Sequence, residues 1–257
     1  MNKVMSDIDA AVADIGSGSS LAVGGFGLCG VPVDLIDAIS RSGVNDLHVI
    51  SNNCGTDDVG LGVLLTKRRV SRVTASYVGE NAEFARQYVE GEIEVELVPQ
   101  GSLAERLRAG GSGIPAFFLR SGVGTLVGDG GLPWRYGADG EVAVASPRKE
   151  AREFDGEVFI LERAITPDFA LVRAGVADRS GNLNFHAAAR NFNPVCAMAA
   201  RFTIVEAEQI VETGSLDPDE IHLPGIYVDR VVPTTPNREK VIERLTTRPI
   251  ESRASQC

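Results

Sequence analysis

Short apolar stretches in the first half of the chain alternate with stretches whose apolar residues recur every three or four positions. The first pattern is typical of buried strands and the second of amphipathic helices. Strands are predicted over 20–25, 47–51, 72–78 and 93–99, and helices over 31–40, 59–67, 80–91 and 102–111. Strand–helix units joined by short, glycine-rich links predict an α/β fold, with an open and mostly parallel sheet covered by helices on both faces.

The second half of the chain is less regular. Residues 122–162 are rich in glycine and in short alternating runs, which predicts antiparallel hairpins inserted at one end of the sheet. Two further strands and a buried helix between them are predicted over 168–178, 201–211 and 187–200. We expect one domain over 1–245, followed by a polar C-terminal tail over 246–257.

Charge and composition narrow the possible partners. The net charge of −10, from 25 basic and 35 acidic residues, argues against nucleic acid and against an anionic membrane surface. No apolar run approaches the ~18 residues that a membrane helix needs. The N-terminal residues contain acids and resemble neither a secretory signal nor a transit peptide, so we expect a cytoplasmic protein.

The cysteines and histidines do not point to a metal site or to a thiol nucleophile. No two cysteines form a CxxC pair, so reduced, structural thiols are expected. A nucleophilic cysteine would need a histidine partner, and the three histidines are expected to be core or surface residues. The residues concerned are Cys29, Cys54, Cys196 and Cys257, with His48, His186 and His222.

A glycine loop between the first strand and the first helix raises the question of a bound cofactor. Gly25-x-Gly27-x-x-Gly30 matches a dinucleotide-binding pattern. That pattern also needs an acidic residue at the end of the next strand, which here ends in Ser51-Asn52-Asn53. NAD is therefore not expected.

The glycines could simply permit a tight turn, because glycine adopts positive φ at little cost. However, four glycines within seven residues, followed by Pro32 at an expected first helical position, exceed what one turn needs. Such a loop leaves backbone N–H groups free at the positive end of a helix. It would suit a phosphate or a chain threaded close to the backbone.

The glycine loop, GGFGLCGVPVDLI, resembles the signature of the A (alpha) subunit of family I coenzyme A transferases. Further segments agree in order, among them SNNCGTDDVGLGVLL, ENAEFARQYVEGEIEVELVPQGSLAERLRAGG, AARNFNPVCAMAA and LDPDEIHLPGIYVDRV. The resemblance extends from about residue 3 to about residue 245. It is closest to members that move CoA from succinyl-CoA to a 3-oxoacid such as acetoacetate.

The resemblance implies that CoA is a substrate, with no tightly bound cofactor, and that the glycine loop binds it. The residues carried over are Gly24, Gly25, Phe26, Gly27, Leu28, Cys29 and Gly30. It also implies ping-pong covalent catalysis, in which a glutamate carboxylate takes the acyl group and then CoA. In the family this glutamate belongs to a B (beta) subunit, in an S-E-N-G-like motif.

No such motif is present in this chain, so we expect a hetero-oligomer whose active site forms between two different chains. Gly79-Glu80-Asn81 is the nearest lookalike. It opens a predicted helix, where Glu80 is expected to cap the first turn or to lie at an interface.

Polar residues near the ends of two strands are the remaining candidates for the site. The resemblance places Gln100, in VPQG, near the substrate carbonyl, where its amide could donate to an oxyanion; a helix-capping amide is the alternative. Asn52 and Asn53 could bind substrate or shape their turn. Arg190 could orient a substrate carboxylate or form a structural salt bridge.

Two other functions stay open from the sequence. Within the family, the chain could be the A (alpha) subunit of a 3-oxoadipate CoA-transferase, since substrate choice also depends on the B (beta) subunit. It could also be a non-catalytic CoA-binding subunit, because the nucleophile is missing under either interpretation.

Overall fold

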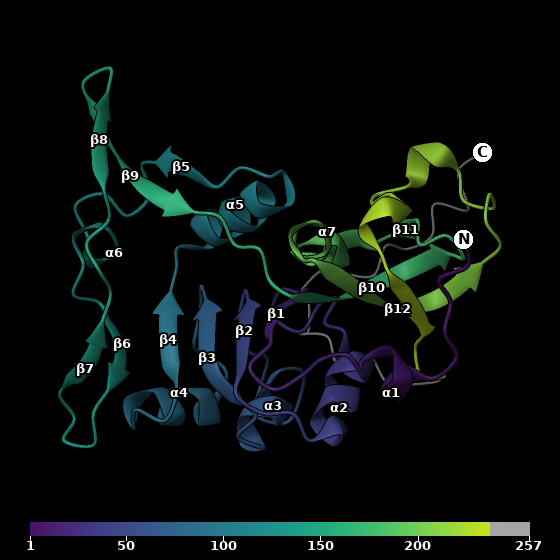
Figure 1. The fold of residues 1–257 in the computed structure, drawn as a ribbon, viewed down its shortest axis with the longest axis horizontal. Coiled ribbons are helices and arrows are strands. Elements are labelled where there is room, and N and C mark those ends of the chain that lie inside the picture. The colour runs from purple at the N-terminus through teal and green to yellow at the C-terminus, as the bar shows by residue number, and fades with distance from the viewer. Residues whose placement is uncertain (237–257) are drawn as a thin grey trace, which may run out of the picture.

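The computed structural model describes residues 1–236, and one large sheet runs through the middle of the molecule (Figure 1). Within these residues, seven strands lie parallel in the order β13-β12-β10-β1-β2-β3-β4, and β11 pairs antiparallel with β10. The strands are Ser20–Val23 (β1), Leu47–Ser51 (β2), Val70–Ala75 (β3), Glu94–Leu97 (β4), Phe169–Asp178 (β10), Leu183–Asn184 (β11), Phe202–Val211 (β12) and Arg230–Pro233 (β13). The predicted open, mostly parallel sheet is confirmed.

Helices cover both faces of this sheet, as predicted. Figure 1 shows α1 to α4 in the lower part of the view and α5 and α7 in the upper part. Their bounds are Ile8–Ala11 (α1), Val33–Ser42 (α2), Gly62–Thr66 (α3), Ala82–Val89 (α4), Gln100–Gly111 (α5) and Asn193–Ala199 (α7).

Buried apolar side chains form two clusters, one on each side of the sheet. The first includes Leu35 of α2 and Phe84 of α4, and the second includes Leu103 of α5. Strand β1 contributes to both, with Leu21 in the first cluster and Ala22 in the second. Since successive strand residues point to opposite faces, a strand that is apolar throughout is the expected signature of a sheet buried on both sides.

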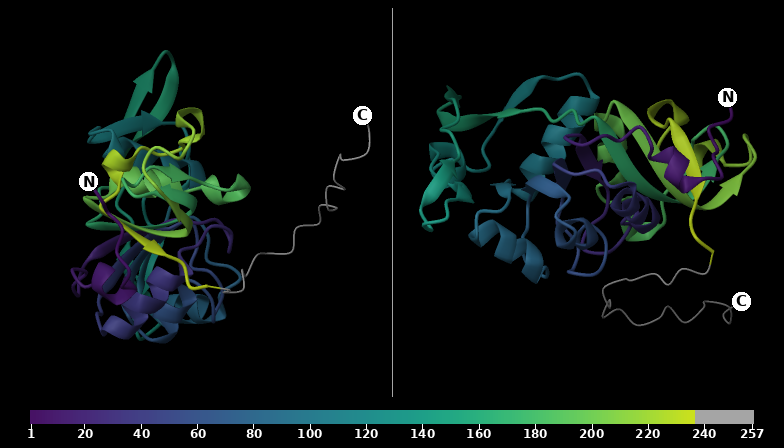
Figure 2. Two further views of the ribbon diagram at one scale, coloured as in Figure 1. Left: turned by 90° about the vertical axis from the view of Figure 1, so that its right-hand side faces the viewer. Right: turned by 60° about the horizontal axis from the view of Figure 1, so that its bottom comes forward.

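An arm of small antiparallel sheets projects beyond β4. It stands at the left of Figure 1 and clear of the main sheet in the right-hand view of Figure 2. Three strands pair in the order β5-β9-β8, and β6 pairs with β7. The elements are Ala116–Leu119 (β5), Leu126–Asp129 (α6), Pro133–Tyr136 (β6), Val142–Ala145 (β7), Ala151–Phe154 (β8) and Glu157–Arg163 (β9). The predicted hairpin insertion at one end of the sheet is confirmed.

The predicted helix over 187–200 is wrong in its first part. Residues Ala187–Arg190 form a short 3-10 turn (η1), and α7 begins only at Asn193. Ala187 has a φ of +45°, which an α-helix does not allow. Pro194 fits the first turn of α7, where its missing N–H costs nothing. Pro32 is likewise one position off, since it is the N-cap of α2 rather than its first helical residue.

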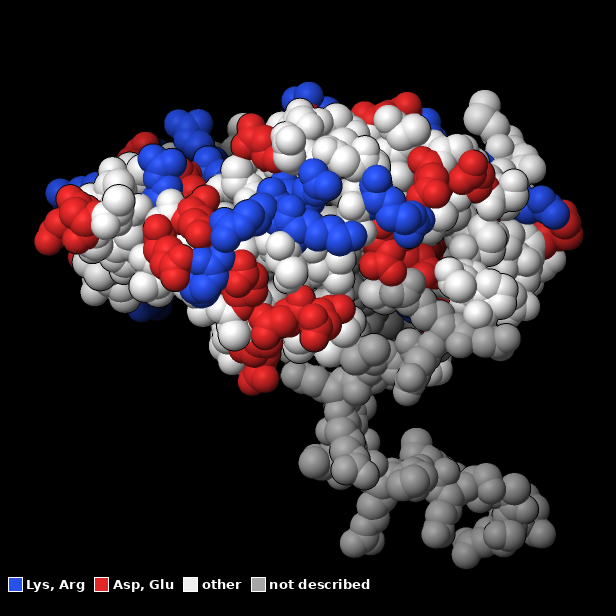
Figure 3. All heavy atoms as spheres, turned by 90° about the horizontal axis from the view of Figure 1, so that it is seen from below, with Lys and Arg blue, Asp and Glu red and all other residues white. Residues whose placement is uncertain are grey.

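Residues 237–257 lie outside the described part of the chain. The predicted tail over 246–257 and Cys257 fall in this segment, and the single domain over 1–245 stays a prediction. Within residues 1–236, no helix is long and apolar enough to cross a membrane. On the face in Figure 3, basic side chains form a band across the middle of the molecule, and clusters of acidic side chains lie beside it.

Candidate active site

The glycine loop after β1 folds back on itself as a tight turn. The N–H of Phe26 donates to the carbonyl oxygen of Cys29, and the N–H of Cys29 donates to that of Phe26, each at 3.0 Å. Gly27 lies at the tip with a φ of +58°, a conformation that favours glycine. The glycines therefore do form a tight turn between strand and helix.

Several backbone donors of this loop have no partner among residues 1–236. The N–H groups of Gly25, Gly27, Leu28 and Gly30 donate no hydrogen bond within residues 1–236. Backbone N–H groups gathered in one turn form a concave site for an electron-rich group. The loop can thus donate to a ligand.

The N-terminus of α2, in contrast, is already occupied by the protein itself. One carboxylate oxygen of Glu206 accepts from the N–H groups of Asp34 and Leu35, at 2.9 and 3.0 Å. The other lies 3.2 Å from the Arg173 guanidinium. The expectation that the positive end of this helix is open to a phosphate is wrong, because the buried carboxyl group of Glu206 already accepts from two of its N–H groups.

Within this arrangement, only Glu206 could have been noticed from the sequence, because it is an acidic residue in a largely apolar strand. The side chain is 0% exposed, and burial raises its pKa to about 8, against the opposing effects of the Leu35 N–H and of Arg173. Buried carboxylates are retained where donors surround them. Glu206 thereby joins β12 to the helix that follows the glycine loop.

Two asparagines that were not among the predicted site residues donate hydrogen bonds to backbone carbonyls of the glycine loop. The side-chain N–H2 of Asn193 donates to the carbonyl of Gly30 at 3.0 Å, and its oxygen accepts from the N–H of Arg173 at 2.9 Å. Asn191 donates to the carbonyl of Cys29 at 3.0 Å. With these carbonyls engaged, the conformation of the loop depends on a segment about 160 residues away in the sequence.

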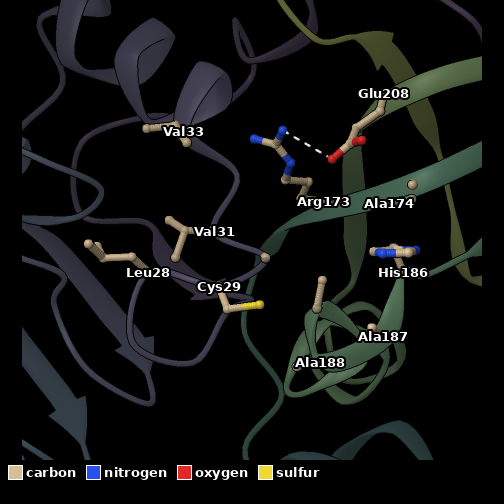
Figure 4. A pocket seen from close by; sticks show the side chains of 13 residues that line it. Leu28, Cys29, Val31, Val33, Arg173, Ala174, His186, Ala187, Ala188 and Glu208 are labelled. Atoms are coloured by element: carbon tan, nitrogen blue, oxygen red, sulfur yellow. Dashed lines mark hydrogen bonds and ion pairs between the residues drawn. The ribbon is translucent and has the colours of Figure 1, made fainter. Parts of the chain in front are cut away.

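A cavity of about 260 Å³ lies beside the loop and between β10 and η1 (Figure 4). Its walls are largely apolar, with Leu28, Val31 and Ala188 among them. At its rim Arg173 pairs with Glu208 at 3.2 Å. The cavity combines a narrow apolar space with one wall of backbone, which suits an extended chain of mixed polarity.

Two of the candidate amides, Asn52 and Gln100, are brought together at the carboxyl edge of the sheet, where β2 and β4 end. The side-chain nitrogen of Asn52 donates to the side-chain oxygen of Gln100 at 3.2 Å and to the hydroxyl of Ser76 at 2.9 Å. Gln100 is the first residue of α5 and is exposed, whereas Asn52 is 4% exposed. No helix-capping hydrogen bond from Gln100 is present, so the alternative of a capping amide is not supported.

Unlike Asn52, Asn53 has no hydrogen-bond partner in the described part of the chain. Its side chain is only 9% exposed, yet it makes no hydrogen bond to any group within residues 1–236. Its amide atoms are not among the buried polar atoms that lack a partner, so the exposed part of the side chain includes the amide. A solvent-accessible amide without an internal partner, next to the Asn52–Gln100 pair, is a group that a ligand can engage.

The structure removes one of the two alternatives for Arg190 and one of the two for Glu80. Arg190 is exposed on η1 and forms no ion pair with the described residues, so the structural salt bridge is not found. Glu80 precedes α4 and does not cap it. The cap is Asn81, whose side-chain oxygen accepts from the N–H of Phe84 at 2.7 Å, and Asp57 accepts from the N–H of Glu83.

The buried thiols and His48 are unsuited to nucleophilic chemistry. Burial raises the pKa of Cys54 and of Cys196 to about 12, which keeps both thiols protonated. His48 contacts Thr74 through Nε2 at 2.9 Å, and burial, with Arg72 nearby, lowers its pKa to about 4. These groups are structural, as predicted.

Comparison with known proteins gives consistent matches over nearly the whole chain. A relative from Mycobacterium tuberculosis, named as the A (alpha) subunit of a probable succinyl-CoA:3-ketoacid coenzyme A transferase, is 62% identical over 248 residues, 96% of this chain and 100% of that protein. The corresponding subunit from Helicobacter pylori is 52% identical over 96% of this chain and 99% of its own length. A mitochondrial relative from Homo sapiens, "Succinyl-CoA:3-ketoacid coenzyme A transferase 2", is 53% identical, but the match spans only 47% of that longer protein.

Solved structures show the same fold. An acyl-CoA transferase from Escherichia coli O157:H7 superposes with a TM-score of 0.77 at 23% identity, over 93% of this chain and 48% of that one. Glutaconate coenzyme A-transferase from Acidaminococcus fermentans gives 0.74 at 23% identity, over 90% of this chain and 75% of that one. A family model described as Coenzyme A transferase matches residues 5–234. The chain therefore belongs to the coenzyme A transferase family.

Proposed function

We propose that this chain is the A (alpha) subunit of a succinyl-CoA:3-ketoacid CoA-transferase, which moves CoA from succinyl-CoA to a 3-oxoacid such as acetoacetate. The observation that carries the proposal is the 62% identity to a relative of that name over its full length. At such identity, the backbone of the site and most of its side chains are expected to be shared. CoA is then a substrate that enters and leaves, not a resident cofactor.

The other half of the active site is proposed to lie on a separate B (beta) subunit. The human relative is about twice as long as the region that this chain matches, and the two bacterial relatives are each named as one subunit of an enzyme. A partner chain would supply the part that the longer protein carries in one polypeptide. The absence of an S-E-N-G-like motif from this chain fits that division.

The reaction proceeds by exchange of one thioester for another. A glutamate carboxylate on the partner chain attacks the succinyl-CoA carbonyl and expels CoA thiolate, leaving a mixed anhydride. The thiolate then attacks the glutamyl carbonyl and releases succinate, which gives an enzyme–CoA thioester. The 3-oxoacid carboxylate takes the CoA by the reverse steps, so bonds and charge balance without ATP or a metal.

Each of these attacks creates a tetrahedral oxyanion, and Gln100 is proposed to stabilise it. Its amide stands exposed at the first turn of α5, beside backbone N–H groups of a helix N-terminus. Donors placed where charge develops typically account for about 10²–10³-fold in rate. Asn53, whose amide has no hydrogen-bond partner among the described residues, is proposed to bind the substrate next to it.

The glycine loop, Gly24 to Gly30, is proposed to hold CoA through the free N–H groups of its turn. Supporting this role are the unpaired donors and the adjoining apolar cavity, which match the alternating amides and methylenes of a pantetheine arm. Binding energy from such contacts, far from the sulfur, can be used to lower the barrier at the reacting carbon.

The test is reconstitution of activity from separate chains. This chain and its partner, each purified alone, should be inactive, and their mixture should convert succinyl-CoA and acetoacetate into acetoacetyl-CoA, followed by its absorbance. A panel of acceptors that includes 3-oxoadipate distinguishes the related family activity. Equal turnover by this chain alone, or no turnover by the mixture with any 3-oxoacid, would refute the proposal.

A further inference from the structure

A short chain of hydrogen bonds links three elements at the carboxyl edge of the sheet. Asn52 follows β2, Ser76 follows β3, and Gln100 begins α5. The Ser76 hydroxyl donates to the backbone carbonyl of Asn52 at 2.9 Å. The side-chain nitrogen of Asn52 donates back to Ser76 Oγ at 2.9 Å and on to Gln100 Oε1 at 3.2 Å.

The direction of each bond in this chain is fixed by chemistry. The Ser76 hydroxyl has one proton, and a backbone carbonyl can only accept, so that proton is used on the carbonyl of Asn52. Ser76 Oγ can then offer only a lone pair to the Asn52 side chain. Asn52 must therefore present its N–H2 end, and the second proton of that nitrogen points to Gln100.

Gln100 receives a donor and so must present its oxygen to Asn52. Its own nitrogen donates to no group within residues 1–236 and is left facing away from the pair. The two ends of an amide differ little in shape, so an exposed glutamine could otherwise turn either end to a substrate. An oxyanion needs the N–H2 end, and a carbonyl oxygen in its place would repel the developing charge.

We propose that Asn52 is a positioning residue that, held by Ser76, fixes the Gln100 amide with its donor end toward the reacting carbonyl. This inference rests on the proposed function, and it assigns to Asn52 and Asn53 different tasks. Asn52 acts only through Gln100, whereas Asn53 keeps a free amide for the ligand. The near-complete burial of Asn52 allows it to hold Gln100 without touching substrate itself.

The most informative variant changes the side chain of residue 52 from a hydrogen-bond donor to an acceptor while keeping its shape. In Asn52→Asp the new carboxylate can only accept, so Gln100 should turn its nitrogen inward and its oxygen toward the substrate. In the reconstituted two-chain enzyme, we expect kcat to fall at least as far as in Gln100→Ala, about 10²-fold, with the KM for succinyl-CoA changed less than about threefold. Ser76→Ala should cause a smaller loss of the same kind.

A double-mutant cycle separates this positioning role from a merely structural one. In the Gln100→Ala background, Asn52→Asp should cost less than about threefold, because the residue on which it acts is gone. Asn184→Asp, whose amide donates to the carbonyl of Glu220, serves as the charge control and should leave kcat unchanged. Thermal unfolding midpoints of all the variants show whether a loss of activity follows a loss of folding.

The outcomes are distinguishable. If Asn52→Asp slows the enzyme equally in both backgrounds, or leaves kcat unchanged, the positioning role is overturned while Gln100 keeps its own. If Gln100→Ala itself leaves kcat unchanged, the proposed oxyanion donor fails, and the positioning role fails with it.

Discussion

The side-chain oxygen of Asn193 lies only 1.9 Å from the point that a Cβ atom on Gly24 would occupy. Gly24 directly follows β1 and is the first residue of the glycine loop, and Asn193 is the first residue of α7, in the second half of the sequence. The φ of Gly24 is not in the left-handed region, so the close approach of Asn193 is what requires a glycine here. The two residues fix the start of the loop against the second half of the chain.

Replacing Gly24 tests this close packing. Gly24→Ala should destabilise the protein by about 1–3 kcal/mol, because the fully buried Asn193 cannot move away without losing its hydrogen bonds. Titration calorimetry of the two-chain complex should also show weaker binding of CoA. Gly16→Ala, where nothing lies within 4 Å of the added methyl, is the matched control and should stay within about 0.5 kcal/mol. Equal effects of the two substitutions would contradict the account.

Removing the Asn193 side chain should have a larger effect than removing that of Asn191. Asn193→Ala leaves the Arg173 N–H and the Gly30 carbonyl without their partner, and we expect a loss of about 2–4 kcal/mol in urea unfolding. Asn191→Ala removes a more exposed contact to Cys29 and should cost about 1 kcal/mol. The reverse order would show that the loop is held by other contacts.

The buried carboxyl group of Glu206 at the N-terminus of α2 provides a third test. Glu206→Ala removes the acceptor of two helix N–H groups and leaves the Arg173 charge buried, so a loss of about 3–5 kcal/mol is expected. The matched control is Glu212→Ala, since Glu212 pairs with Arg179 on the surface and should contribute less than about 1 kcal/mol. Both values come from equilibrium unfolding in urea. Similar losses in the two variants would contradict a structural role for Glu206 at the helix.

The lowered pKa of His48 makes stability depend on pH in a stated direction. The unfolded chain takes up a proton near the ordinary pKa of 6.5, whereas the folded protein resists it down to about 4. Between these values the unfolded state binds more protons, so the free energy of unfolding falls as pH falls. Between pH 7 and pH 5, wild type should lose about 2 kcal/mol more than His48→Gln. Parallel pH profiles for the two proteins would show that His48 titrates normally.

Local patterns in the sequence predicted most of the framework. Strand β2 lies at the expected residues 47–51, because a short apolar run between turns is read from neighbouring residues alone. The segment 187–200 was predicted as one helix because its alanines favour a helix. In the structure, α7 begins only at Asn193, whose side chain joins the glycine loop to β10. Contacts between residues so far apart leave no periodic signal.

For the candidate site, too, local patterns were predictable from the sequence and contacts between distant residues were not. That Asn52 and Gln100 belong to one edge follows from parallel strands, whose carboxyl ends meet there. The hydrogen bonds from the α2 N-terminus to Glu206 could not be predicted, because an acidic residue within a strand pattern does not indicate which group it contacts. The direction of the hydrogen bonds from Ser76 to Gln100 could not be predicted either, because it depends on how three separate segments lie relative to one another.

The central claim is that this chain supplies the CoA loop and the oxyanion donor while another chain supplies the attacking carboxylate. Intact-mass spectrometry of the two-chain complex, incubated with acetoacetyl-CoA and denatured rapidly, tests it most directly. The account predicts a mass increase equal to bound CoA on the partner chain and an unmodified mass for this one. A CoA adduct on this chain, at Glu80 or any other carboxylate, would contradict it.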